Sequence, residues 1–136
     1  MAGVRVAHRW IVDLFAVLLV VQFFLAGLGA FTTVHNKRFS DNDFGPHGVL
    51  GTALVVLALV IAVLAVIGRW SPTATRLSGA LLGLMILQFV LGVAGAGSSP
   101  VLGGLHAVNA VLIVAVLYLL VRGTHHLARA APPSAA

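Results

Sequence analysis

Apolar residues run almost without interruption over four stretches of the chain, and short polar or glycine-rich links separate them. The stretches cover residues 11–30, 49–67, 77–94 and 101–121, and each is 18 to 21 residues long. At about 1.5 Å per residue, an α-helix of that length crosses a hydrocarbon core of about 30 Å. The alternating pattern of a membrane-spanning β-strand is absent. The sequence therefore predicts an all-α membrane protein with four transmembrane helices.

The composition supports this prediction. Hydrophobic residues make up 60% of the 136 residues and charged residues only 8%, with a mean hydropathy of +1.11. An ordinary soluble domain has about 25% charged residues. A single core of this size cannot bury so much apolar surface, so a lipid bilayer is the expected surrounding. There is no cysteine, which excludes disulfides, iron–sulfur clusters and thiolate ligands.

The positive charges predict the orientation in the membrane. The net charge is +5, but the charges flank apolar stretches, so we expect no nucleic-acid partner. Arginines without neighbouring acids lie before the first stretch, between the second and third, and after the fourth: Arg5, Arg9, Arg69, Arg76, Arg122 and Arg129. The positive-inside bias then predicts an up-down-up-down bundle with both termini in the cytoplasm, in a bacterial-type plasma (inner) membrane.

We expect residues 1–129 to form one transmembrane domain and residues 130–136, with Pro132 and Pro133, to be a disordered tail. The first apolar stretch follows two arginines, as in a secretory signal. It is longer than the roughly 7–15 apolar residues of a signal core, so we expect it to be retained.

The first and second halves of the chain share a polar pattern. Gln22 is followed by Leu25, Ala26, Gly29 and Ala30, and Gln88 is followed by Leu91, Gly92, Gly95 and Ala96. Each segment then leads through a link to a stretch that opens with a histidine, His47 or His106. Polar residues inside a membrane are costly, so their repetition is informative. The pattern predicts two repeated helical hairpins related by a pseudo-two-fold axis along the membrane normal.

His47 and His106 are the candidate metal ligands. Both lie at the outer side of even-numbered spans, which are diagonal in such a bundle, so their side chains can face each other across its centre. Small neighbours leave clearance for a flat macrocycle: Gly48, Gly51, Ala107 and Ala110. Two imidazoles suit the six-coordinate iron of haem b, whereas zinc takes three or four protein ligands. The alternatives are helix capping with hydrogen bonds across the bundle, or a site for a quinone or copper.

Gln22 and Gln88 lie in the middle of the odd-numbered spans and are candidate cofactor-binding residues. They could contact the cofactor edge, orient a ligand imidazole or line a quinone site. The alternative is interhelical hydrogen bonding, worth about 0.6–2 kcal/mol for each contact. Asn109, three residues after His106, shares its helix face and has the same two roles open to it.

Lys37 and Arg38 are the cations available in the outer link to pair with haem propionates. The alternative is that they are solvated and paired with Asp41 and Asp43. In the same link, His35 is a loop residue or lies at a cofactor edge. The remaining histidines are expected to anchor helix ends at the membrane interface: His8, His125 and His126.

These residues resemble one four-helix half of the heme A synthase family. The similarity is carried by residues 87–93 (Leu-Gln-Phe-Val-Leu-Gly-Val), by Leu105-His106 with its small neighbours, and by His47 at the start of the second helix. It extends over residues 11–121. The resemblance implies a bundle whose second and fourth helices supply haem-coordinating histidines at the outer side. It also implies that a homodimer would recreate the eight-helix arrangement of the tandem family.

The chain departs from that family at three places. Phe44 stands where the catalytic bundle has a glutamate, with Asp43 one residue further away, and Gly48 stands where an arginine follows the histidine. The cysteine pair of many members is missing. These departures put oxidation of a haem methyl group in doubt and leave the haem-binding histidines in place, so enzymatic activity stays open.

We therefore expect a membrane b-type haem protein, with haem near the extracytoplasmic face, that serves electron transfer or haem handling. A redox partner or a quinone would exchange electrons with it. The alternative is a haem-free accessory or scaffold subunit of a larger membrane complex.

Overall fold

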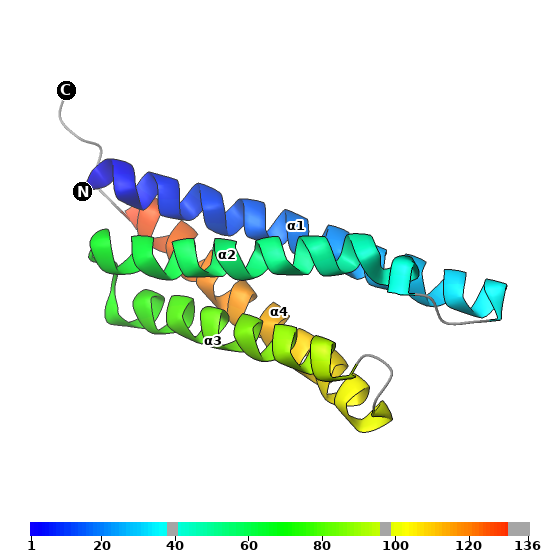
Figure 1. The fold of residues 1–136 in the computed structure, drawn as a ribbon. Coiled ribbons are helices and arrows are strands. Elements are labelled where there is room, and N and C mark those ends of the chain that lie inside the picture. The colour runs from blue at the N-terminus through cyan, green and yellow to red at the C-terminus, as the bar shows by residue number, and fades with distance from the viewer. Residues whose placement is uncertain (38–40, 96–98, 131–136) are drawn as a thin grey trace.

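The computed structural model describes residues 1–37, 41–95 and 99–130, with side chains at 41–42 and 127–130 left outside the description. Its elements are α1 (Ala2–Asn36), the 3-10 helix η1 (Asp41–Phe44), α2 (Gly45–Ile67), α3 (Pro72–Gly95) and α4 (Pro100–Ala130) (Figure 1). Four helices are each long and apolar enough to cross a membrane. The protein is therefore a multi-pass, all-helical membrane protein, as the sequence predicted.

The helices contain the four predicted stretches and extend beyond them. α1 begins at Ala2 and ends at Asn36, and α4 continues to Ala130. Hydropathy detects where apolar residues begin and end, whereas a helix continues through charged residues until a breaker stops it. At 35 residues, α1 is about 52 Å long. Residues 131–136 of the expected tail lie outside the described residues.

Prolines mark the starts of the other three helices. Pro46 lies in the first turn of α2, and Pro72 and Pro100 open α3 and α4. Proline fits this position because its missing N–H would have no partner in the first turn of a helix. The start of α3 is capped as well, since the backbone N–H of Ala74 donates to Ser71 Oγ at 3.3 Å.

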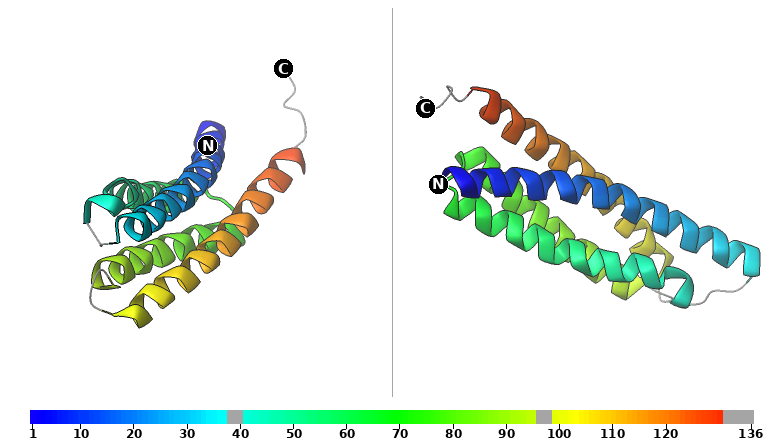
Figure 2. Two further views of the ribbon diagram at one scale, coloured as in Figure 1. Left: turned by 90° about the vertical axis from the view of Figure 1, so that its right-hand side faces the viewer. Right: turned by 90° about the horizontal axis from the view of Figure 1, so that it is seen from above.

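The four helices form a bundle in which the start of α1 and the end of α4 lie at the same end (Figures 1 and 2). Backbones contact one another in the cyclic order α1–α2–α3–α4–α1, and within the described residues the diagonal pairs make no such contact. Towards the opposite end, the α1–α2 hairpin and the α3–α4 hairpin diverge (Figures 1 and 2). The bundle is thus closed at one end and splayed at the other.

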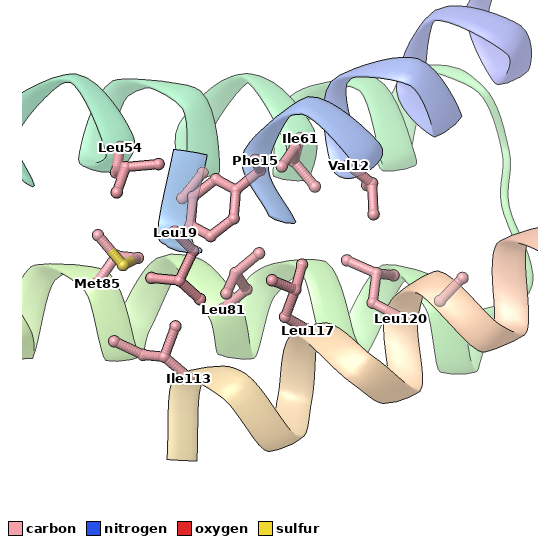
Figure 3. Packing of buried hydrophobic residues seen from close by; sticks show 12 residues of the cluster. Val12, Phe15, Leu19, Leu54, Ile61, Leu81, Met85, Ile113, Leu117 and Leu120 are labelled. Atoms are coloured by element: carbon pink, nitrogen blue, oxygen red, sulfur yellow. The ribbon is translucent and has the colours of Figure 1, made fainter. Parts of the chain in front are cut away.

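The apolar core occupies only the half of the bundle that contains the termini. We call residues 2–19, 54–67, 72–85 and 113–130 the terminal half, and residues 22–36, 45–51, 88–95 and 100–109 the histidine half. The buried core residues are Val12, Phe15, Leu19, Leu54, Ala58, Ile61, Ala65, Ala74, Leu81, Met85, Ile113, Leu117 and Leu120. Figure 3 shows the side chains of these residues, except Ala65, converging between the helices. They recur every three or four residues, as expected for one face of each helix.

Polar contacts also join helices in the terminal half. The Arg5 guanidinium donates hydrogen bonds to the carbonyls of Gly68 (2.9 Å) and Arg69 (3.0 Å), where α2 ends. His125 Nε2 lies 2.9 Å from Asp13 Oδ1 and connects α4 to α1. These contacts satisfy main-chain carbonyls and an acid that would otherwise face a largely apolar surrounding.

His8 is a core residue and not the interface anchor that we expected. It is fully buried. Its Nε2 atom lies 3.4 Å from Ser78 Oγ, and its ring centre lies 5.0 Å from that of Trp70. The expectation was wrong because His8 precedes the first apolar stretch, while α1 continues through it and turns it towards α3.

Candidate functional site

His47 and His106 lie side by side at the centre of the histidine half. Their ring centres are 6.3 Å apart and their planes are inclined by 62°. They come from α2 and α4, whose backbones do not contact each other, so the imidazoles reach across the diagonal of the bundle. The structure therefore brings together the two residues that the sequence indicated as a pair.

Both histidines are oriented by main-chain carbonyls. His47 Nδ1 lies 3.2 Å from the carbonyl oxygen of Gln22, and His106 Nδ1 lies 3.0 Å from that of Gln88. A carbonyl can only accept, so Nδ1 carries the proton and Nε2 keeps its lone pair in each neutral ring. Metal-binding histidines are commonly held in this way, with one nitrogen donating to a carbonyl and the other on the metal.

The Gln22 side chain contacts His47 as well. Its amide nitrogen donates to the His47 carbonyl at 2.9 Å and lies 3.4 Å from His47 Nε2. The second contact is long and weak. The Gln22 amide would have to leave Nε2 before that atom could bind a metal. His106 differs, because its hydrogen bond to a protein group within the described residues is made through Nδ1.

Asn109 fastens α4 to α3 beside the histidine pair. Its amide nitrogen donates to the carbonyl of Leu84 at 2.9 Å and to Gln88 Oε1 at 2.7 Å. Gln88 thus contributes its carbonyl to His106 and its side chain to Asn109. Of the two roles open to these polar residues, interhelical hydrogen bonding is the one that the protein atoms display.

Two buried acceptors in this region have no donor within the described residues. They are Gln22 Oε1 and Asn109 Oδ1. In each case the amide nitrogen of the same side chain is already engaged, which fixes the oxygen on the other side. Buried polar atoms normally have a partner, so these oxygens are places where a ligand or a water could donate. The sequence pointed to both residues, but it could not show that their side-chain oxygens are buried without a hydrogen-bond donor.

Glycines make room for these contacts. A Cβ atom on Gly92 would lie 3.2 Å from His106 Cε1, and one on Gly51 would lie 3.0 Å from Gln22 Nε2. A Cβ on Gly29 would lie 2.8 Å from the Asp43 carbonyl oxygen and from the Phe44 ring. Larger residues at these positions would displace the neighbouring side chains. Steric clearance therefore explains why glycine stands at these three positions.

Phe44 closes the site on the side of η1. Its ring packs edge-on against His47, with centres 6.3 Å apart and planes inclined by 80°. An aromatic ring at this place transfers no proton, unlike the glutamate that the resemblance would put there. The nearest acid in sequence, Asp43, instead accepts a hydrogen bond from Thr33 Oγ1 at 3.2 Å.

The structure does not bring Lys37 to the histidine pair. Lys37 is the C-cap of α1 and follows Gln22 by 15 residues, which is about 22 Å along the helix axis. His35, in the last turn of α1, is exposed and equally remote. Within the described residues Lys37 forms no ion pair. Arg38 and the side chain of Asp41 lie outside the described residues.

The donor set suits an axial pair better than a metal cage. The described residues contain no group of three or more histidine or acidic side chains that could hold a metal ion. The two imidazoles, with ring centres 6.3 Å apart, are the paired nitrogen donors that the described part of the chain offers.

Comparison with known proteins gives one family. Residues 22–96 match a family of unknown function, DUF6220. The match includes Gln22, His47 and Gln88 and ends before His106. None of the curated proteins and none of the solved structures matches the chain.

Proposed function

The chain belongs to this family of unknown function, DUF6220, because the match covers more than half of it, and we propose that it is a membrane b-type haem protein. His47 and His106 would be the axial ligands. When bound, haem b supplies one-electron transfer, and the protein would use it for electron transfer or haem handling. The observation that carries the proposal is the pair of imidazoles, 6.3 Å between centres, each oriented by a main-chain carbonyl.

The chain's own residues would divide the work of binding. The carbonyls of Gln22 and Gln88 hold the Nδ1 protons, so that both Nε2 lone pairs are available to a metal. The Gln22 amide would move away from His47 Nε2, a weak contact of 3.4 Å, although the same nitrogen also donates to the His47 carbonyl at 2.9 Å.

We place both termini in the cytoplasm, in an up-down-up-down arrangement in a bacterial-type inner membrane. The support is the distribution of charge. Arg5, Arg9, Arg69, Arg76 and Arg122 lie in or next to the terminal half, and Lys37, directly after α1, is the described cation at the opposite end of the bundle. The positive-inside bias then puts the histidine pair near the extracytoplasmic face. A quinone or another redox protein would exchange electrons there, and a homodimer would restore the eight-helix arrangement of the resembled family.

A second candidate is a haem-free accessory or scaffold subunit. It is favoured by the Gln22 side chain, which contacts His47 Nε2, and by Asn109, which joins α3 to α4. In that case these polar residues are interhelical fasteners, and the protein would be colourless.

The test is the absorption spectrum of protein purified in detergent after expression with added hemin. We expect a sharp Soret band, with resolved α and β bands on dithionite reduction, as for low-spin six-coordinate haem. His47→Ala and His106→Gly should each abolish the six-coordinate spectrum. Added imidazole should restore it to His106→Gly, because a free ligand can fill the cavity. His35→Ala is the matched control, since His35 is an exposed histidine of α1 and should not change the spectrum.

Size-exclusion profiles separate loss of ligation from loss of folding in these variants. A colourless wild-type protein after hemin loading would contradict the haem proposal and favour the scaffold. Unchanged spectra in both histidine variants would contradict the assignment of the ligands.

A further inference from the structure

A groove of about 350 Å³ lies between the start of α3 and the end of α4, at the end of the bundle opposite to the histidine pair. Its lining has a polar part and an apolar part. Ser71, Thr73, Arg122 and His126 form the polar part, and leucines that include Leu77 and Leu119 form the apolar part. The groove is therefore amphipathic, and it does not depend on the haem proposal.

Arg122 in the groove lacks a protein counter-charge within the described residues. Arg122 and His126 are one helical turn apart on the same face of α4. Neither takes part in a hydrogen bond or ion pair within the described residues, and none of the described lining residues is acidic. The acid of this half, Asp13, is engaged by His125, which faces α1. A cation at a membrane surface gains most from an anionic partner.

The polar and apolar parts of the groove are ordered along the helices. Leu77 lies one turn after Thr73 in α3, and Leu119 lies one turn before Gly123 in α4. Because α3 enters and α4 leaves the bundle at this end, Leu77 lies about 6 Å deeper than Thr73, and Leu119 lies about 4.5 Å deeper than Arg122 and about 10.5 Å deeper than His126. A ligand that fills the groove would place a charged group at the end of the bundle and an apolar group towards its middle.

We propose that this groove binds an anionic phospholipid. The phosphate would contact Arg122, His126 and the Thr73 hydroxyl, and the beginning of an acyl chain would lie along Leu77 and Leu119. Charge and depth both select this ligand. A free phosphate would leave the apolar part unused, and a zwitterionic lipid carries no net charge to balance Arg122. Basic pockets between transmembrane helices are suited to anionic headgroups.

The experiment measures bound lipid by native mass spectrometry of the full chain in maltoside micelles. Increasing mole fractions of dioleoyl phosphatidylglycerol or dioleoyl phosphatidylcholine are added. We expect saturable binding of one phosphatidylglycerol. Arg122→Gln should weaken it about fivefold, the loss expected for one basic contact with anionic lipid. Arg76→Gln is the matched control, because Arg76 is an exposed arginine of α3 outside the groove and the change in net charge is identical. It should change the affinity less than twofold.

Two further measurements keep the result decisive. Arg122→Lys should retain most of the affinity, which shows that a weakened Arg122→Gln variant has lost a charge and not its fold. Inorganic phosphate at millimolar concentration should not displace the bound lipid. Equal losses in Arg122→Gln and Arg76→Gln, equal binding of phosphatidylcholine, or displacement by phosphate would each overturn the proposal.

Discussion

The terminal half and the histidine half of the bundle are held together by different kinds of contact. In the terminal half, apolar side chains from all four helices interlock and are almost completely buried. In the histidine half, Gly29 and Asn109 are the buried residues among those described, and the helices are joined by hydrogen bonds of Gln22, His47 and Gln88. The core of the terminal half is held by close packing of apolar side chains, whereas the helices of the histidine half are joined by a few hydrogen bonds.

This difference separates stability from candidate chemistry along the length of the helices. Lipid tails are as apolar as a leucine side chain, so packing inside a membrane stabilises mainly through close contact and not through exclusion of water. The terminal half supplies that contact. The histidine half can then keep polar groups and loosely packed backbone that a ligand would need. Substitutions in the two halves should therefore have separable effects on unfolding and on ligand binding.

The largest effect on stability is expected from Phe15→Ala in the terminal half. Phe15 is fully buried, and truncation leaves a cavity that costs about 3 kcal/mol. Phe24→Ala is the control, because Phe24 is 66% exposed on the same helix and should change stability by less than about 0.5 kcal/mol. The measurement is unfolding by sodium dodecyl sulfate in mixed micelles, followed by circular dichroism. Equal losses in the two variants would show that the terminal half is not the packed one.

A smaller effect is expected from Gly29→Ala at the junction of α1 with η1. The new methyl group would meet the Asp43 carbonyl oxygen and the Phe44 ring at 2.8 Å, and such overpacking costs about 1–3 kcal/mol. Because Phe44 packs on His47, the absorption spectrum of the proposed haem should shift as well.

Gly27→Ala is the matched control, since its Cβ would meet nothing within 4 Å. It should be neutral or slightly stabilising, because alanine is the better helix former. A Gly29→Ala variant as stable as Gly27→Ala would mean that α1 and η1 are not in close contact.

The smallest effect is expected for the interhelical hydrogen bond between Asn109 and Gln88. Asn109→Leu and Gln88→Leu each remove the hydrogen bond of 2.7 Å between their side chains. A double-mutant cycle should give a coupling of about 0.6 kcal/mol, the average for interhelical hydrogen bonds in membranes. The same unfolding assay measures it. A coupling as large as the Phe15→Ala loss would contradict the division between the two halves.

The sequence was sufficient to predict the four spans and the meeting of His47 with His106. Both predictions depend on features that do not require knowledge of the packing. A long apolar run can only be a helix in lipid. A repeated polar residue inside a span must face a partner. Helix ends were predicted less well, because α1 and α4 continue through charged residues that hydropathy counts as loop.

Contacts between distant segments could not be predicted. Arg5 reaches the end of α2, and His8 is buried against Ser78 and Trp70. These contacts depend on the rotation of α1 about its own axis, which no local pattern encodes. The remoteness of Lys37 from the histidine pair could not be predicted either. Its distance from Gln22 follows from the sequence only once α1 is known to continue as a helix beyond residue 30.

The orientation of the two histidines has a consequence for how this site can vary between relatives. The acceptors of both Nδ1 protons belong to the main chain at positions 22 and 88, and a helix offers a carbonyl at those positions whatever side chain stands there. For this role alone the side chain at these positions can vary, whereas the rotational phase of the helix cannot. One inserted residue between the packed half and position 22 or 88 would turn the carbonyl by about 100° and release the imidazole. Relatives that keep the histidine pair should tolerate exchanges at these positions and reject insertions before them.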